Sequence, residues 1–191
     1  MITQPAIRKA YEKYGVKAFY QNFGDSYRNP HEATIFKIIE AVNSTYKIDF
    51  NKVLDLASGS GEVTLALRAL GYTNVDGVEP YTFNAYFERT GKRADKYRFE
   101  EIEQGILSDR RYSIIICSFA LHLAQPSRLP TLSYQLSRIA PSLLIITPHK
   151  KPHIKPEWGW TLLNELMLER VRARLYKSIP LSLSRASEGS R

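Results

Sequence analysis

The stretch VLDLASGSG, residues 53–61, decides the fold class of this chain. Its first five residues form a short, mostly apolar run that predicts a buried strand. The two glycines after it, Gly59 and Gly61, let the backbone approach a ligand closely. Residues 62–70 carry apolar side chains at helical spacing, and Gly71 suits the end of that helix. The stretch therefore predicts a strand, a glycine turn and a helix whose first N–H groups are free for a ligand.

Strands and helices alternate on both sides of this stretch. Upstream, Asn29 as N-cap, Pro30 at the first helical position and Glu32 three residues after the cap predict a helix to about Asn43. Downstream, the pattern predicts helices over 81–90 and 129–140 and strands over 74–78, 97–99, 113–117 and 142–146. This order is typical of a doubly wound α/β fold with a mostly parallel sheet, whose ligand crevice lies beyond the carboxyl ends of the strands.

The C-terminal part follows a different pattern. Residues 160–168 are predicted as a helix, and residues 169–176, which alternate charged and apolar side chains, as a strand. The last dozen residues, rich in serine, predict a loose tail or an edge strand. We expect one globular unit in two parts, an N-terminal helical cap or lid over residues 1–51 and a ligand-binding core over residues 52–191.

Composition bounds the class of protein and its compartment. The chain has 191 residues, a net charge of +8 and one cysteine, Cys117. One cysteine forms neither an internal disulfide nor a zinc site of four cysteines or of two cysteines and two histidines, so we expect no metal. The N-terminal stretch has no apolar signal region, and no apolar run approaches about 18 residues. We therefore expect a cytoplasmic protein with no membrane contact.

Much of the positive charge lies toward the C-terminus. Residues 149–155 (HKKPHIK) form one basic cluster, and arginines follow at Arg170, Arg172 and Arg174. Such a surface could neutralise the phosphates of RNA. The chain has no RGG run, no basic-aromatic repeat and no zinc finger. A nucleic-acid partner therefore stays open but is not favoured over a solvated basic face.

A second motif narrows the class of ligand. Glu79 lies 18 residues beyond Gly61, at the predicted carboxyl end of the next strand. A carboxylate there can accept hydrogen bonds from the vicinal hydroxyls of a ribose. A dinucleotide fingerprint needs a third glycine where the chain has Thr64, and the glycine turn is not a P-loop. The two motifs together predict a ribose-containing ligand without a pyrophosphate.

These residues resemble two motifs of a known enzyme family. The stretch 53–61 is similar to motif I of the class I, Rossmann-like S-adenosylmethionine (SAM)-dependent methyltransferases, and residues 77–80 (GVEP) are similar to their second motif. The resemblance covers about residues 52–148, roughly half of the chain, and departs from the family at Ala57, where many members have glycine. It implies an enzyme with SAM as cofactor and methyl transfer as reaction.

The resemblance also assigns candidate site residues. For the cofactor they are Asp55, Ala57, Ser58, Gly59, Gly61, Glu79, Pro80, Ser118 and Phe119, with either Glu100 or Glu101 as the acid that contacts adenine. His122 and His149 each follow a predicted strand, so both are candidates for a catalytic base, with a structural role as the alternative. Candidates for substrate contacts are Tyr20, Tyr27, Arg28 and Trp158.

The acceptor is expected to be a small molecule with a nucleophilic oxygen or nitrogen. After the predicted strand 113–117 the chain reads CSFA and lacks the [DNS]-P-P-[YF] signature, which in related enzymes holds a planar amine. The segment 118–123 is more similar to the small-molecule branch of the family. Two alternatives stay open, an RNA methyltransferase that uses the basic C-terminal region and a SAM-binding protein without turnover. The sequence sets no oligomeric state.

Overall fold

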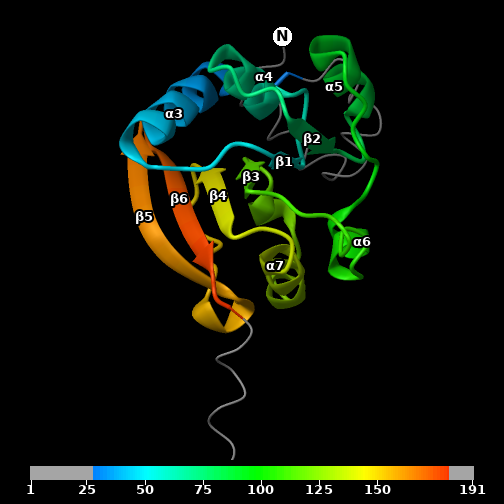
Figure 1. Cartoon of the computed structure of the whole chain (residues 1–191), viewed down its shortest axis with the longest axis vertical. Coiled ribbons are helices and arrows are strands. Elements are labelled where there is room, and N and C mark those ends of the chain that lie inside the picture. The colour runs from blue at the N-terminus through cyan, green and yellow to red at the C-terminus, as the bar shows by residue number, and fades with distance from the viewer. Residues whose placement is uncertain (1–27, 181–191) are drawn as a thin grey trace, which may run out of the picture.

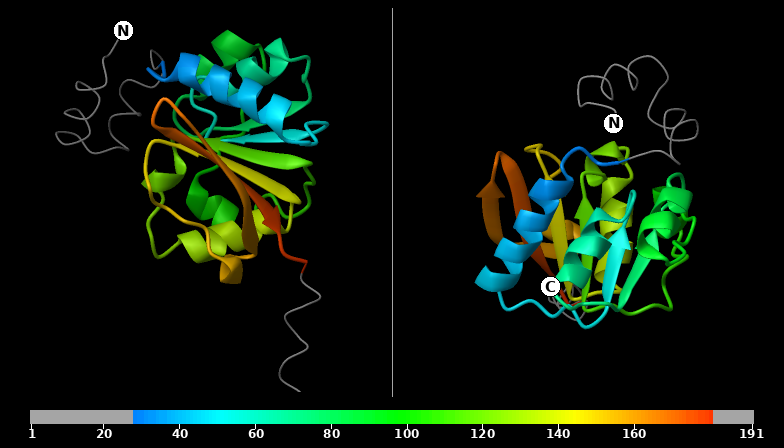
Figure 2. Two further views of the ribbon diagram at one scale, coloured as in Figure 1. Left: turned by 90° about the vertical axis from the view of Figure 1, so that its left-hand side faces the viewer. Right: turned by 90° about the horizontal axis from the view of Figure 1, so that it is seen from above.

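The computed structural model describes residues 28–180, which form a six-stranded sheet with helices on both faces (Figures 1 and 2). The strand order is β2-β1-β3-β4-β6-β5. Strands β1 to β4 are parallel, whereas β6 runs antiparallel to both of its neighbours, β4 and β5. The doubly wound, mostly parallel α/β architecture predicted from the sequence is therefore confirmed.

Strands and helices alternate along the chain up to β4, except that α6 directly follows α5, and β5 and β6 form a hairpin at the end. The strands are β1 (Val53–Leu56), β2 (Val75–Val78), β3 (Ile114–Ser118), β4 (Ser142–Thr147), β5 (Trp160–Leu168) and β6 (Val171–Ser178). The helices are α3 (Glu32–Thr45), α4 (Glu62–Ala69), α5 (Phe83–Thr90), α6 (Phe99–Glu103) and α7 (Leu129–Ser137), with 3₁₀ turns η2 (Leu121–Leu123) and η3 (Pro156–Trp158). In the described part of the chain, no helix has both the length and the apolar character that a membrane span needs.

The central strands are buried on both faces, which explains their uninterrupted apolar sequence. On one face, Ile114 and Ile116 of β3 belong to a core cluster with residues of α3 and α4. On the other face, Ile115 and Cys117 belong to a second cluster with residues of α6 and α7. Figure 1 shows α3, α4 and α5 on one side of the sheet and α6 and α7 on the other. This double burial is why the strands near 53–57, 113–117 and 142–146 could be predicted.

The helix predicted over 160–168 is wrong, because these residues form the edge strand β5. They pair with β6 along the whole hairpin, and the pairing register shifts between Leu162 and Asn164. A β-bulge of this kind breaks the alternation of inward and outward side chains. The apolar residues on the two sides of the bulge thereby acquire a spacing that resembles a helix. The neighbouring strand predicted over 169–176 is confirmed as β6, and the predicted tail from residue 181 lies outside the described residues.

Two further predictions fail at the ends of elements. Residues 97–99 are not a strand, since Phe99 begins α6. At the sheet edge beside β2, the described chain has an isolated bridge between Val78 and Asp95 in place of a strand. The N-cap of α3 also differs from the predicted residue, Asn29. The N-cap is His31, and the side chain of Asn29, two residues earlier, accepts a hydrogen bond from the His31 N–H (2.9 Å).

The outer edge of β2 has its carbonyl groups bound by other parts of the chain. The ammonium group of Lys92 donates to the carbonyl oxygens of Thr73 (2.7 Å) and Val75 (3.3 Å). The N–H of Asp95 donates to the carbonyl oxygen of Gly77 (2.9 Å). These three bonds take the place of a third parallel strand on this side of the sheet.

A buried tyrosine of α5 packs against both the glycine turn and β2. Tyr86 of α5 is fully buried, and its hydroxyl lies 3.1 Å from the hydroxyl of Thr64 on α4. A Cβ atom on Gly77 would lie 2.6 Å from the Tyr86 ring, and one on Gly61 would lie 3.3 Å from it. The two glycines therefore leave room for one aromatic ring, and Gly77 is needed for packing rather than for its backbone conformation.

We predict that Gly77→Ala lowers the free energy of unfolding by about 1–3 kcal/mol, the usual effect of overpacking a well-filled core. Chemical denaturation measures this loss. The control is the same substitution in a Tyr86→Ala background, where the ring is absent and Gly77→Ala should cost much less. An equal loss in both backgrounds would show that the tyrosine ring is not the cause.

Candidate functional site

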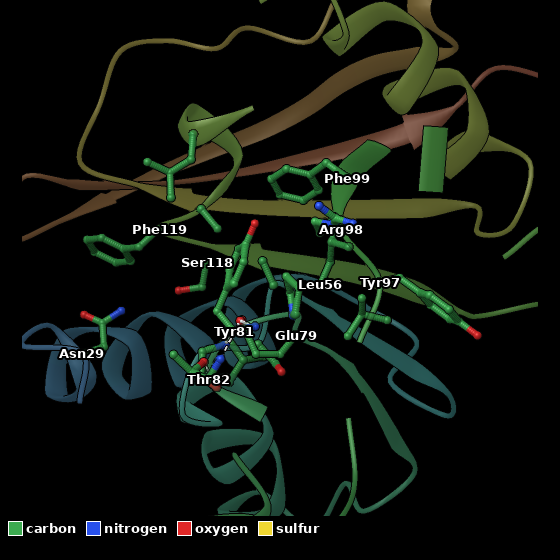
Figure 3. Close-up of a pocket in the computed structure, with 18 of the residues that line it drawn as sticks. Asn29, Leu56, Glu79, Tyr81, Thr82, Tyr97, Arg98, Phe99, Ser118 and Phe119 are labelled. Atoms are coloured by element: carbon green, nitrogen blue, oxygen red, sulfur yellow. Dashed lines mark hydrogen bonds between the residues drawn. The ribbon is translucent and has the colours of Figure 1, made fainter. Parts of the chain in front are cut away.

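A cavity of about 280 Å³ lies at the carboxyl ends of β1, β2 and β3 (Figure 3). This is the place where doubly wound parallel sheets bind their ligands. Four segments form most of its wall: residues 57–59 after β1, residues 79–82 after β2, residues 97–100 before and within α6, and residues 118–120 at the end of β3. Asn29, before α3, also lines the cavity. The site is thus built from loops held by the sheet.

Glu79 is the central polar residue of this wall. It is only 6% exposed, and its carboxylate accepts backbone hydrogen bonds from Gly59 (3.0 Å) on one oxygen and from Tyr81 (2.8 Å) and Thr82 (3.1 Å) on the other. Burial raises the pKa of Glu79, and these backbone N–H groups act in the opposite direction. Within residues 28–180, the oxygen that binds Gly59 accepts one hydrogen bond, so it keeps a lone pair for a further donor.

The glycine turn uses a left-handed backbone at three positions. Ala57, Gly59 and Gly61 have φ angles of 54°, 58° and 92°. An alanine in this region costs roughly 1 kcal/mol more than a glycine, which explains physically why many members of the resembled family have glycine where this chain has Ala57. Ala57, Ser58 and Gly59 line the cavity. Gly61 is the N-cap of α4 and is not part of the wall.

Asp55 lies beneath the turn rather than in the cavity wall. One of its carboxylate oxygens accepts hydrogen bonds from the backbone N–H (3.2 Å) and the hydroxyl (2.7 Å) of Thr64. The other oxygen is buried and has no hydrogen-bond partner among residues 28–180. Burial is the main reason that the pKa of Asp55 is raised to about 7. Asp55 therefore ties β1 to the first turn of α4.

The two neighbouring acids predicted near adenine have different surroundings. Glu100 lines the cavity, together with Tyr97 and Arg98. The carboxylate of Glu101 instead accepts a hydrogen bond from the backbone N–H of Arg98 (3.0 Å), as part of the capping box that begins α6. Only Glu100 is thus placed where it can meet a ligand in the cavity.

The end of β3 contributes a hydroxyl and an aromatic ring. Ser118 and Phe119 both line the cavity, and the Phe119 ring stacks on the His31 ring at a centroid distance of 4.6 Å. The hydroxyls of Ser118 and Ser58 are buried and have no hydrogen-bond partner in the described chain. Buried polar groups are usually paired, so two unpaired hydroxyls on one cavity wall are consistent with a polar ligand there.

The two candidate bases, His122 and His149, lie against each other. Their ring centroids are 4.4 Å apart, although the rings come from the segments after β3 and β4. Neither is part of the cavity wall, which ends beside them at Ala120 and Leu123. Desolvation, and then the proximity of His149, lower the pKa of His122 to about 4. His122 is therefore neutral at pH 7 and able to accept a proton.

Of the remaining predicted site residues, one lines the cavity and two of the described ones do not. Pro80 lines the cavity as predicted. Arg28 is exposed and does not line it, and Trp158 packs against the core cluster beneath α7 with Lys155 over its ring. Tyr20 and Tyr27 lie outside the described residues.

A charged network that the sequence analysis missed joins the glycine turn to the start of α3. Arg89 of α5 donates to the carbonyl oxygen of Ser60 (3.1 Å) and to the carboxylate of Glu62 (3.1 Å), and it also pairs with Glu32. Glu62 is 3% exposed, lines the cavity and accepts a hydrogen bond from the backbone N–H of Asn29 (3.3 Å). These residues are brought together only by the tertiary fold, so a local sequence pattern cannot predict their network.

The structure is similar to solved methyltransferases. Magnesium protoporphyrin IX methyltransferase (ChlM) from Synechocystis PCC 6803 with bound SAH matches with a TM-score of 0.60 and 13% identity, over 93% of this chain and all of that one. A SAM dependent methyltransferase from Aquifex aeolicus matches with a TM-score of 0.58 and 16% identity, over 80% of this chain and 94% of that one. The chain therefore has the Rossmann-like fold of the class I methyltransferases.

Sequence comparison gives one clear relative. No model of a protein family matches the chain. The uncharacterized protein C17A5.05c of Schizosaccharomyces pombe is 32% identical to it over 219 aligned positions, which cover 86% of this chain and 89% of that protein. Within the class I methyltransferase fold, this chain belongs to the same protein family as C17A5.05c.

We predict that Asp55→Asn changes how stability depends on pH. The folded protein holds the Asp55 proton up to a pKa of about 7, whereas an unfolded aspartate releases it near 3.8. The free energy of unfolding of the natural protein therefore contains a part that falls as pH rises from about 4 to about 7. Asparagine cannot ionise, so the variant lacks this part. Urea denaturation of both proteins at pH 4.5, 6 and 8 measures the difference, and parallel curves would contradict the prediction.

Proposed function

We propose that this protein is a SAM-dependent methyltransferase that transfers the methyl group to an oxygen or nitrogen of a small molecule. The observation that carries the proposal is the buried carboxylate of Glu79 beside the glycine turn, at the carboxyl end of β2. On the same fold, the structure of ChlM holds SAH.

The residues of the cavity fit the chemical groups of SAM. The free lone pair of Glu79 suits a ribose hydroxyl, and Glu100 suits the amino group of an adenine. The unpaired hydroxyls of Ser58 and Ser118 suit the polar end of the cofactor. Leu56, Val63 and Val78 add apolar wall against which a nucleoside can pack.

Methyl transfer from SAM requires little acid-base catalysis by the protein. When bound, SAM supplies a methyl group that is already activated by its sulfonium. The chain must hold the acceptor in line with that group and keep water out, and the apolar side chains of Phe119 and Leu123 serve the second task. A base is needed only where the acceptor is protonated. We assign that role to neutral His122, with His149 beside it.

The segment before α3 is proposed as the lid of this site. Asn29 lines the cavity and is tied to the glycine turn through Glu62, so the chain before it begins at the cavity rim. The aromatic residues Tyr20 and Tyr27 precede this point in the sequence, and aromatic faces attract cations such as a sulfonium. Residues 1–51 as a cap and 52–191 as the core remain the proposed division.

An RNA acceptor is the second candidate, and one observation favours it. Lys150, Lys151 and His153 follow β4 with exposed side chains and form no ion pair within residues 28–180. Exposed lysine ammonium groups that form no ion pair in this part of the chain are available to phosphates. The small molecule is preferred because none of these three residues lines the cavity.

We predict that the protein binds SAH and that Glu79→Gln weakens this binding about 10- to 100-fold. Loss of a hydrogen bond to a charged group costs about 1.5–3 kcal/mol, which corresponds to that range. Isothermal titration calorimetry measures both affinities. Glu88→Gln, the same charge change at an exposed position of α5, is the matched control and should bind like the natural protein. A natural protein that binds neither SAH nor SAM would refute the function.

We predict that methyl-labelled SAM, incubated with the protein and a cell extract, labels the small-molecule fraction. Separate counting of small-molecule, RNA and protein fractions decides between the candidates. Label in RNA, with an RNA affinity that falls steeply with salt, would favour the second candidate. Binding of SAM without any labelled product would instead indicate a protein without turnover.

A further inference from the structure

Arg174, in the middle of β6, is a buried cation in which each of the three guanidinium nitrogens donates a hydrogen bond. It is 1% exposed. Its Nε donates to the carboxylate of Glu165 (2.7 Å), its Nη1 to the carbonyl oxygen of Pro152 (3.2 Å) and its Nη2 to that of Lys150 (3.0 Å). A buried ion pair adds little net stability compared with apolar residues of similar size. Because net stability does not explain Arg174, we look for its role at the two carbonyl groups that it binds, those of Lys150 and Pro152.

Both carbonyls belong to the segment that leaves the carboxyl end of β4. Residues 148–155 contain no helix or strand, so their backbone lacks the regular hydrogen bonds of secondary structure. The side chains of Pro152 and Ile154 are buried, whereas Lys151 and His153 are exposed. A planar guanidinium can bind two carbonyl oxygens and a carboxylate at once, which a lysine ammonium cannot do with the same geometry. Arg174 thus fixes this segment to the β5–β6 hairpin.

The segment held in this way begins with His149. The backbone N–H of His149 donates to the hydroxyl of Thr147 (3.1 Å), and the next residue, Lys150, is the one whose carbonyl Arg174 binds. The His149 ring lies 4.4 Å from the ring of His122, which belongs to η2 on the other side of β4. The position of His149 against His122 therefore depends on a backbone that Arg174 holds.

We infer that Arg174 is a positioning residue for the acceptor side of the site, which keeps His149 against His122 by binding the backbone of residues 150–152. The role in acceptor chemistry rests on the proposed function. The structural part of the inference does not, because it concerns two imidazole rings and one guanidinium. Arg174 acts without touching the cavity, since it is not among the residues that line it.

The test is a pH titration of the histidine ring signals by NMR in the full chain, which has four histidines. In Arg174→Met the segment loses both carbonyl bonds and His149 moves away from His122. We expect the midpoint of His122, which burial and then the proximity of His149 lower to about pH 4, to rise when the His149 contribution is lost. The control Arg172→Met removes a neighbouring cation that pairs with the same Glu165 but binds neither carbonyl, so the midpoint should stay unchanged.

Further readouts separate this inference from the proposed function. The affinity of Arg174→Met for SAH should stay within about twofold of the natural value, whereas transfer to the labelled small-molecule fraction should fall. If Arg174→Met does not fold, Arg174→Lys decides, because it keeps a cation beside Glu165 and cannot bind both carbonyls. An unchanged His122 midpoint in a folded Arg174 variant overturns the inference. Failure of the protein to bind SAH would refute the function and leave this titration valid.

Discussion

The three backbone hydrogen bonds accepted by the buried Glu79 carboxylate are the interaction on which the rest of the site depends. They join the glycine turn after β1 to the loop after β2, two segments about 20 residues apart in the chain. Burial of a charged carboxylate is costly, and hydrogen bonds from N–H groups offset that cost. The same group thus sets the shape of the cavity and leaves one oxygen for a ligand. Tyr86, packed against Gly77, keeps the two segments at the distance that these bonds require.

Two arginines hold the connecting segments around this centre. Arg89 joins the glycine turn to the start of α3 through Ser60, Glu62 and Glu32. Arg174 joins the segment after β4 to the β5–β6 hairpin. Both use a forked guanidinium to bind backbone carbonyls as well as a carboxylate, which fixes loops that have no regular structure of their own. The loops at the carboxyl ends of the strands are therefore set by side chains from distant elements.

The sequence predicts well what depends on local pattern and poorly what depends on distant contacts. The strand near 113–117 was predictable because burial on both faces leaves an apolar run, and Glu79 because its distance from the glycine turn follows from one strand-helix-strand unit. β5 could not be predicted because the β-bulge at Leu162 interrupts the alternation of inward and outward side chains along the strand. The roles of Arg89 and Arg174 had no local signal. Glu100 and Glu101 differ only in the direction of their side chains, which α6 determines.

The hydrogen bonds along the outer edge of β2 affect the tendency of this protein to self-associate at high concentration. An exposed sheet border offers its peptide groups as a template on which a second chain can form a strand, a route to fibrous association. Here Lys92 occupies the oxygens of Thr73 and Val75, and Asp95 occupies that of Gly77. The Lys92 side chain and the Asp95 bridge thereby occupy carbonyl groups that would otherwise be open to a strand of another chain. Lys92 also places a positive charge at the edge where such a strand would pair.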